Sequence, residues 1–111
     1  MYFKELTAKL ISPLWRVREV EIEGIDVREH WDENDDEGWV TVKDFEVSDD
    51  DTLDIFFHIG APNGTKYKVE LLGKIEDGAD GKDFEFTEEY EVISKGRLRI
   101  DISEKVEEHI A

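Results

Sequence analysis

The stretch Leu53-Asp54-Ile55-Phe56-Phe57-His58-Ile59 decides the fold class, because its apolar and polar residues alternate. In a β-strand every second side chain points to the same side, so Leu53 and every second residue after it would form one apolar face. Phe56 lies on the opposite face and indicates a strand that is covered on both sides. We therefore expect a central strand over 53–59.

Three further strands are predicted after this one, each with one apolar and one polar face. They cover 66–75, 84–92 and 97–102, and Gly73 marks a candidate bulge in the first of them. The segment Gly60-Ala61-Pro62-Asn63-Gly64 is rich in turn-forming residues and is expected to be a hairpin loop. Four consecutive strands would then form an antiparallel meander.

The first half of the chain also alternates, but less regularly. Its apolar pairs between 15 and 27 change phase twice, which predicts two bulges or bends, the second at Gly24. Residues 39–47 form another expected strand. Residues 2–11 fit a strand or a short helix equally well, and Ser103 could cap a short C-terminal helix.

About seven short strands separated by turns predict an all-β fold, an antiparallel β-sandwich of the Greek-key or immunoglobulin-like kind. At 111 residues and 13.0 kDa, residues 1–111 should form a single domain. The chain has no cysteine, which excludes disulfides, thiolate catalysis and cysteine-ligated metals. Its stability must therefore come from the hydrophobic core.

The overall charge restricts the ligands, because 30 acidic and 14 basic side chains give a net charge of −16 and a pI near 4.4. Nucleic acids and anionic membrane surfaces are disfavoured, since phosphate binding requires Lys and Arg. No stretch approaches the ~20 apolar residues of a membrane span, and the first residues lack the apolar run of a signal peptide. We expect a cytoplasmic protein whose partner is basic.

The negative charge is concentrated between Glu29 and Asp54, which include twelve acids and one base. Two acidic runs, 31–38 and 49–51, flank the strand expected over 39–47. At ~3.3 Å per residue they would lie about 30 Å apart, too far to share one metal ion. Such a line of carboxylates could match an extended basic groove. The residues expected to contact the partner are Asp32, Glu33, Asp35, Asp36, Glu37, Asp44, Glu46, Asp49, Asp50, Asp51, Trp31 and Trp39.

Calcium binding is the main alternative use of these acids, through loops 31–38, 49–52 and 77–83. The first loop resembles an EF-hand ligand pattern only in part, because Glu37 stands where that loop needs glycine and Lys43 where it needs a bidentate glutamate. Solvated acidic loops without an ion explain the same residues, and no metal or other cofactor is predicted.

The remaining candidates point to structure more than to catalysis. Trp31 and Trp39 could stack on a ligand or pack in the core. His58 lies inside the central strand, where a hydrogen-bonded structural role is expected. The sequence contains no phosphate-binding loop, nucleophile elbow or zinc-protease motif, so no catalytic residue is predicted.

The leading hypothesis is therefore a non-enzymatic protein whose acidic surface occupies a basic, for example nucleic-acid-binding, site on a protein partner. Immunity proteins and DNA mimics act as inhibitors in this way, since complementary charge speeds their association. A calcium- or carbohydrate-binding module is one alternative. A structural or accessory subunit whose charge serves solubility is another.

Overall fold

The computed structural model describes residues 1–12, 16–47, 50–76 and 81–110, and most of them belong to β-strands. Seven of its nine strands have seven residues or more, as the sequence predicted. The strands are β1 (Tyr2–Ile11), β2 (Arg16–Ile22), β3 (Ile25–Asp26), β4 (Asp32–Glu33), β5 (Glu37–Glu46), β6 (Thr52–Gly60), β7 (Lys66–Glu76), β8 (Lys82–Glu91) and β9 (Arg97–Lys105).

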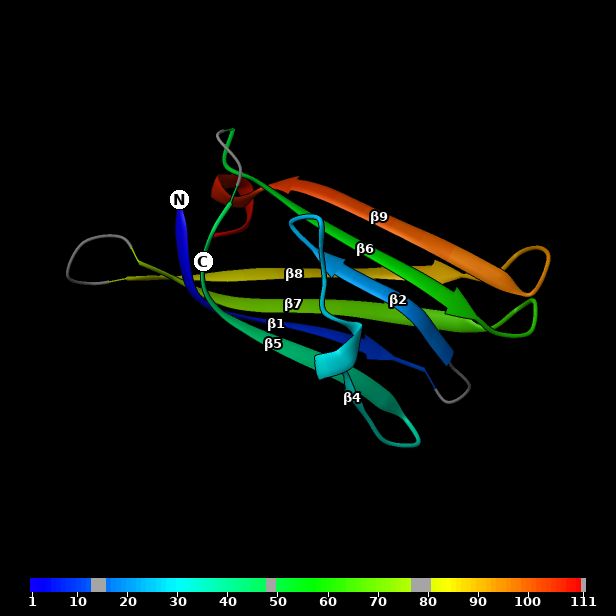
Figure 1. The fold of residues 1–111 in the computed structure, drawn as a ribbon. Helices are drawn as coiled ribbons and strands as arrows, with labels where there is room; N and C mark the ends of the chain where they lie inside the picture. The colour runs from blue at the N-terminus through cyan, green and yellow to red at the C-terminus, as the bar shows by residue number, and fades with distance from the viewer. Residues whose placement is uncertain (13–15, 48–49, 77–80, 111) are drawn as a thin grey trace.

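The strands form two antiparallel sheets that face each other, which confirms the predicted sandwich (Figure 1). The five-stranded sheet has the order β4-β5-β1-β7-β8, and the four-stranded sheet has the order β3-β2-β6-β9. Buried residues from both sheets make one continuous hydrophobic cluster between them. A sandwich core of this kind is about 10 Å thick.

Two short 3₁₀ turns complete the described structure, η1 (Arg28–His30) and η2 (Val106–His109). The sequence suggested a C-terminal helix capped by Ser103, but β9 continues through this residue to Lys105. The Ser103 hydroxyl instead donates a hydrogen bond to Asp54 on the neighbouring strand, at 2.6 Å. No helix in the described parts of the chain is long and apolar enough to cross a membrane.

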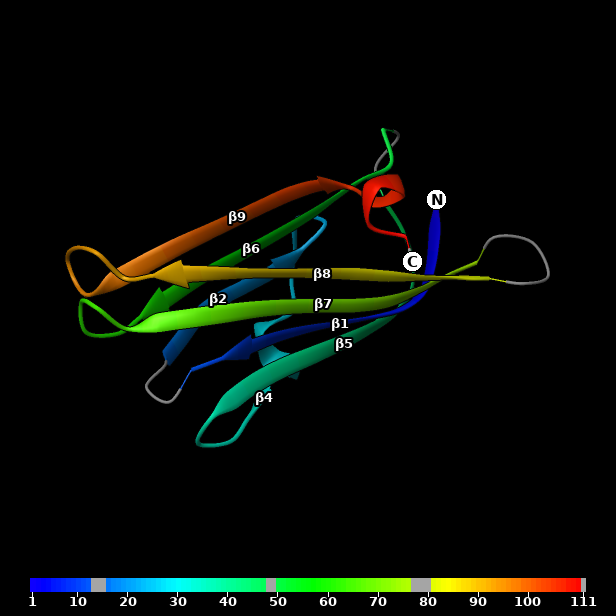
Figure 2. The ribbon, with the colours of Figure 1, turned by 180° about the vertical axis from the view of Figure 1, so that it is seen from behind.

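The predicted meander is wrong, because the chain changes sheet between β6 and β7 and again between β8 and β9. Only β7 and β8 form a hairpin within that group. β6 pairs with β9, so the first and last of four consecutive strands are neighbours, as in a Greek key. Figures 1 and 2 show these crossings at the end of the sandwich opposite the two termini.

The segment 60–64 contains the expected turn residues but acts as a corner between sheets, not as a hairpin. Its neighbour is the β8–β9 connection, and backbone hydrogen bonds join the two: Ala61 N–H to Gly96 O at 3.0 Å and Val92 N–H to Thr65 O at 2.9 Å. The two connections thus satisfy part of each other's backbone hydrogen-bonding capacity. Turn-forming residues alone do not distinguish a reversal from such a corner.

Bulges account for the irregular alternation in the first half. The register of β2 shifts between Val17 and Glu19, as predicted from the first change of phase. The second change is a tight turn at Gly24, where the φ angle is +76°. Residues 2–11 form a strand, and its register shifts between Phe3 and Glu5. This shift explains why the segment also fitted a helical spacing.

Gly73 pairs with Leu6, close to that shift, and is not itself bulged. A Cβ atom at Gly73 would come within 2.7 Å of the Phe3 ring, so the glycine makes room for a fully buried aromatic side chain. Close approach of a neighbour is the second reason, beside a bulge, for glycine inside a strand.

The central position predicted for the stretch 53–59 is confirmed, since β6 lies between β2 and β9. Its alternate residues from Leu53 to Ile59 are at most 1% exposed and face the core. Phe56 and His58 lie on the outer face, which is only partly covered by neighbouring side chains. One face of β6 therefore lies in the core, while the other is partly exposed.

Candidate functional site

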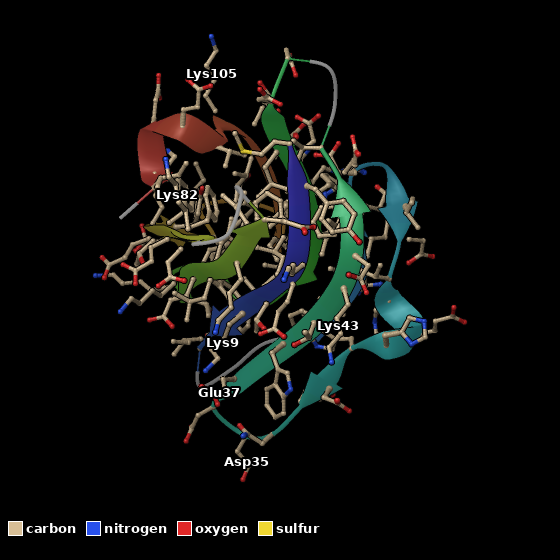
Figure 3. The ribbon with its side chains drawn as sticks, turned by 90° about the vertical axis from the view of Figure 1, so that its left-hand side faces the viewer. Lys9, Asp35, Glu37, Lys43, Lys82 and Lys105 are labelled. Atoms are coloured by element: carbon tan, nitrogen blue, oxygen red, sulfur yellow. The ribbon has the colours of Figure 1, made fainter. Side chains whose placement is uncertain are left out.

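The β4–β5 hairpin holds the first acidic run in a defined turn. The Asn34 side chain accepts hydrogen bonds from the backbone N–H groups of Asp36 and Glu37, both at 3.0 Å, and Asn34 N–H donates to Glu37 O at 2.9 Å. These contacts leave the Asp35 and Asp36 side chains exposed. Figure 3 shows Asp35 at the tip of the hairpin, pointing away from both sheets.

The predicted acids before and after this turn lie along the same edge of the five-stranded sheet. β4 pairs with β5 only at Gly38 and Trp39, so the rest of β5 has no strand on that side among the described residues. Charged side chains protect such an edge from pairing with another chain. We call the acids of this surface the acidic edge: Asp32, Glu33, Asp35, Asp36, Glu37, Asp44 and Glu46.

Most of the acidic edge lacks a positive neighbour. Glu37 lies 3.6 Å from the Lys9 ammonium group, a pair visible in Figure 3. Within the described residues, the carboxylates of the other acids of the edge have no ion pair within 4.0 Å. The edge therefore presents negative charge that the protein itself does not neutralise.

Asp44 has a backbone φ angle of +56°, and its carboxylate accepts a hydrogen bond from the Tyr2 hydroxyl at 2.9 Å. This hydrogen bond is the main cause that raises the pKa of Tyr2 above its usual value; partial burial and the charges of Asp44, Glu76 and Glu46 act in the same direction. The negative field of the edge thus extends to the end of β5.

The second predicted run is separate from the acidic edge. The Asp51 carboxylate forms an ion pair with the N-terminal ammonium group of Met1 at 3.1 Å. Asp50 accepts a hydrogen bond from Thr52 N–H at 3.2 Å. Both lie beyond the far end of β5, as the sequence indicated, while Asp49 lies outside the described residues. The two acidic runs therefore flank β5 at opposite ends, as the sequence predicted.

The two tryptophans predicted at the interface differ in their burial. Trp31 is only 7% exposed, and its ring packs edge-on against Phe57 at 6.1 Å between centroids. The prediction that Trp31 contacts a partner is therefore wrong, because its ring belongs to the core. Trp39 is partly exposed on the outer face, between Asp32 and Lys9 in the strand register.

The outer face of the five-stranded sheet is more balanced in charge. Lys43, Glu5, Lys74 and Asp83 are successive partners across four strands, so opposite charges alternate. A shallow pocket of about 330 Å³ opens on this face around Leu72, which is 50% exposed. Alternating charges cancel over a short distance, so this face contributes little to the net field.

In the part of the chain that the structure describes, one group of side chains has the spacing of a metal site. The ligand atoms of Glu104, Glu108 and His109 lie within 4.8 Å of one another. The His109 ring nitrogen is 3.2 Å from a Glu104 oxygen, and the ring packs edge-on against Phe84 and Phe86. These contacts give the imidazole a structural role without an ion.

His58 is largely buried, as expected for a structural residue. Its Nδ1 atom lies 3.3 Å from a Glu19 carboxylate oxygen across the strand pair. Its Nε2 atom is buried and has no hydrogen-bond partner among the described residues. The ion pair joins β6 to β2 on the outer face of the four-stranded sheet.

The same outer face carries a group of residues that did not stand out in the sequence. Arg18 on β2 and Arg97 and Arg99 on β9 lie on either side of β6. Their positions in the chain are too far apart to form a motif. Only the pairing of β6 with both β2 and β9 brings them together, so no local pattern could have identified them.

Comparison with protein-family models, curated proteins and solved structures finds no significant match.

Proposed function

We propose that this protein is a non-enzymatic binding protein whose acidic edge occupies a basic site on a protein partner. The observation that carries the proposal is the set of exposed, unpaired carboxylates on the ordered β4–β5 hairpin. Asp32, Glu33, Asp35 and Asp36 are all exposed, and the hairpin projects from one side of the sandwich (Figure 1). A projecting acidic hairpin fits a basic groove better than it holds a small substrate.

Unpaired charge on a rigid element favours fast association. A hairpin whose backbone is held by a defined turn needs little reordering when it meets a partner, and complementary charge raises association rates by roughly 10- to 1,000-fold at low salt. The same carboxylates would repel acidic proteins and nucleic acids, which contributes specificity. A carboxylate that is already paired within the chain, such as Glu37 with Lys9, contributes less to association with a partner than an unpaired one does.

The length of the acidic edge supports a groove as the target. From Glu37 to Glu46 the strand spans about 30 Å at ~3.3 Å per residue. This length matches an extended groove. A groove that normally holds a nucleic acid would be blocked by such a line of carboxylates. Inhibition in the manner of an immunity protein or DNA mimic in the cytoplasm is the form of binding that we propose.

The test compares two variants with the same change in charge. The edge variant is Asp32→Asn, Glu33→Gln, Asp35→Asn and Asp36→Asn. The matched control is Asp83→Asn, Glu85→Gln, Glu89→Gln and Glu91→Gln on β8, the opposite edge of the same sheet. Each protein is used for affinity purification from its native host at low and moderate salt, and the affinity for any recovered protein is then measured.

A basic protein should bind the wild type and the control, with weaker binding as salt increases. The edge variant should bind at least about 10-fold more weakly and with a smaller dependence on salt. Equal affinity of the edge variant and the control would contradict the proposal. A large rise in melting temperature with millimolar calcium would instead favour a cation-binding module.

A further inference from the structure

Three arginine side chains come together on the outer face of the four-stranded sheet, at the end where the chain crosses between sheets. Arg97 pairs in register with Gly60 and Arg99 with His58, both on β6. Cross-strand neighbours have Cβ atoms about 4.5–5.5 Å apart. Arg18 on β2 approaches from the other side. We call Arg18, Arg97 and Arg99 the arginine cluster.

Gly60 allows Arg18 to reach across β6. The Nε atom of Arg18 lies 3.0 Å from the position that a Cβ atom on Gly60 would take. The guanidinium group therefore lies against the strand backbone, next to the position from which Arg97 projects. A larger residue at 60 would force this side chain away from the other two arginines.

The arginine cluster is not neutralised by the protein, although acidic side chains outnumber basic ones by 30 to 14. All three side chains are exposed, and among the described residues none has a carboxylate within 4.0 Å. The nearest acid in the strand register, Glu19, interacts with His58. By contrast, Arg28 donates a hydrogen bond to Val17 O at 3.0 Å and is structural.

Bringing three like charges together is unfavourable unless an opposite charge joins them. We propose that the arginine cluster binds a tetrahedral oxyanion, the phosphate or sulfate group of a small molecule. Guanidinium groups present several N–H donors in a plane and match the oxygens of such groups better than ammonium groups do. Donors from two strands on either side of β6 could contact different oxygens of one anion.

The surroundings limit the ligand to a small one. Glu19 lies in the same row as Arg99, across His58, and in the next row Phe56 is flanked by Glu21 and Asp101, so acids border the cluster on this side. A polyanion such as DNA would extend over these carboxylates and meet the field of a protein with net charge −16. A small anion is shielded from that field over a Debye length of about 8 Å in physiological salt.

The experiment titrates the whole protein with inorganic phosphate, sulfate and pyrophosphate, with sodium chloride used to hold ionic strength constant. Binding is followed by the NMR signals of the arginine Nε–H groups and of the Gly60 backbone amide. We expect saturable shifts confined to the arginine cluster and its neighbours, with pyrophosphate bound most tightly. A preference for phosphate over sulfate, or the reverse, indicates which group the natural ligand carries.

Variants locate the site. Arg97→Gln with Arg99→Gln should weaken pyrophosphate binding about 10- to 100-fold, as expected for the loss of charge-assisted hydrogen bonds. The matched control is Lys43→Gln with Lys74→Gln, which removes the same charge from the other sheet and should bind as the wild type does. The edge variant should also retain binding, so this result is independent of the proposed partner function.

Three outcomes would overturn the inference. The first is the absence of saturable shifts when ionic strength is constant. The second is an equal loss of binding in the lysine control, which would reflect overall charge alone. The third is single-stranded DNA bound through the arginine cluster more tightly than pyrophosphate, which would replace the small ligand with a nucleic acid.

Discussion

The acidic edge and the arginine cluster differ in how the chain builds them. Residues 32–37 supply most of the acidic edge from one hairpin, whereas the arginine cluster takes residues from β2 and β9, which are joined only through β6. Apart from Glu37, which pairs with Lys9, both present charge that the protein leaves without a counter-ion among the described residues. Net charge therefore conceals local surfaces of opposite sign.

β6 connects the two regions through its two faces. Its core face places Phe57 against Trp31, which anchors the segment leading into the acidic edge. Its outer face supplies Gly60 and His58 beneath the arginine cluster. Substitutions in and around β6 can therefore show whether the two regions depend on each other.

The largest effect is expected for Phe57→Ala, which removes a fully buried ring from the central strand. The free energy of unfolding should fall by about 3–5 kcal/mol, because the substitution leaves a cavity that the core cannot close. Chemical denaturation measures this change. Phe56→Ala on the outer face is the control and should have a clearly smaller effect. Equal effects would show that the two faces of β6 are not distinct.

Two glycine substitutions should affect the two regions independently, with smaller changes in the free energy of unfolding. A Cβ atom on Gly38 would overlap the Trp31 ring, so Gly38→Ala should lower the free energy of unfolding by about 1–3 kcal/mol. A Cβ atom on Gly60 meets only the flexible end of Arg18, so Gly60→Ala should leave stability within about 1 kcal/mol and weaken oxyanion binding. If the Gly38→Ala variant were fully folded but had lost oxyanion binding, the acidic edge and the arginine cluster would not be independent.

A smaller effect on stability should distinguish the unpaired acids of the acidic edge from the acids of β8. Raising the salt concentration should stabilise the wild type, because screening reduces repulsion among the unpaired carboxylates of the acidic edge. The edge variant should be about 0.3–1 kcal/mol more stable than the β8 control at low salt and nearly equal at high salt. Thermal unfolding over a salt series measures this difference. No difference at low salt would mean that the edge charges do not repel one another.

The smallest effect at neutral pH concerns a tyrosine outside both regions. Burial, the hydrogen bond to Glu88 and the charges of Glu88 and Glu104 raise the pKa of Tyr90 well above its usual value. In the unfolded chain this tyrosine loses its proton near pH 10. Because the unfolded state ionises first, the wild type should lose stability as the pH rises above about 10.

Tyr90→Phe should remove part of this alkaline loss while changing stability at pH 7 by only about 0.5 kcal/mol. Denaturation at neutral and alkaline pH measures both values. If the variant lost stability as steeply as the wild type, the raised pKa of Tyr90 would not contribute to the alkaline loss.

The sequence predicted the elements better than their connections. Alternation placed β6, β7 and β9 correctly, because a sandwich buries one face of each strand and the pattern records that burial directly. It also indicated the irregular β2, since a bulge changes the phase of the pattern. The segment 60–64 was misassigned because pairing across a corner depends on residues 91–97, which local turn residues do not report.

The surfaces show the same limit. The acidic run was predicted as a surface because neighbours in the sequence remain neighbours on a hairpin. Trp31 was assigned to that surface by proximity in sequence, but the ring fills space beside Gly38 and Phe57 in the core. The arginine cluster could not be predicted, because the distance between Arg18 and Arg97 is set by strand order alone.

The crossings between the two sheets also have a consequence for the speed of folding. Ile11 pairs with Lys68 and Tyr2 with Glu76, so most of the sheet forms only after long loops have closed. Chains dominated by such distant contacts fold in about milliseconds to seconds, far more slowly than helical bundles of similar size. An anion held by β2, β6 and β9 together would find no site until this slow search is over, and would therefore delay unfolding without hastening folding.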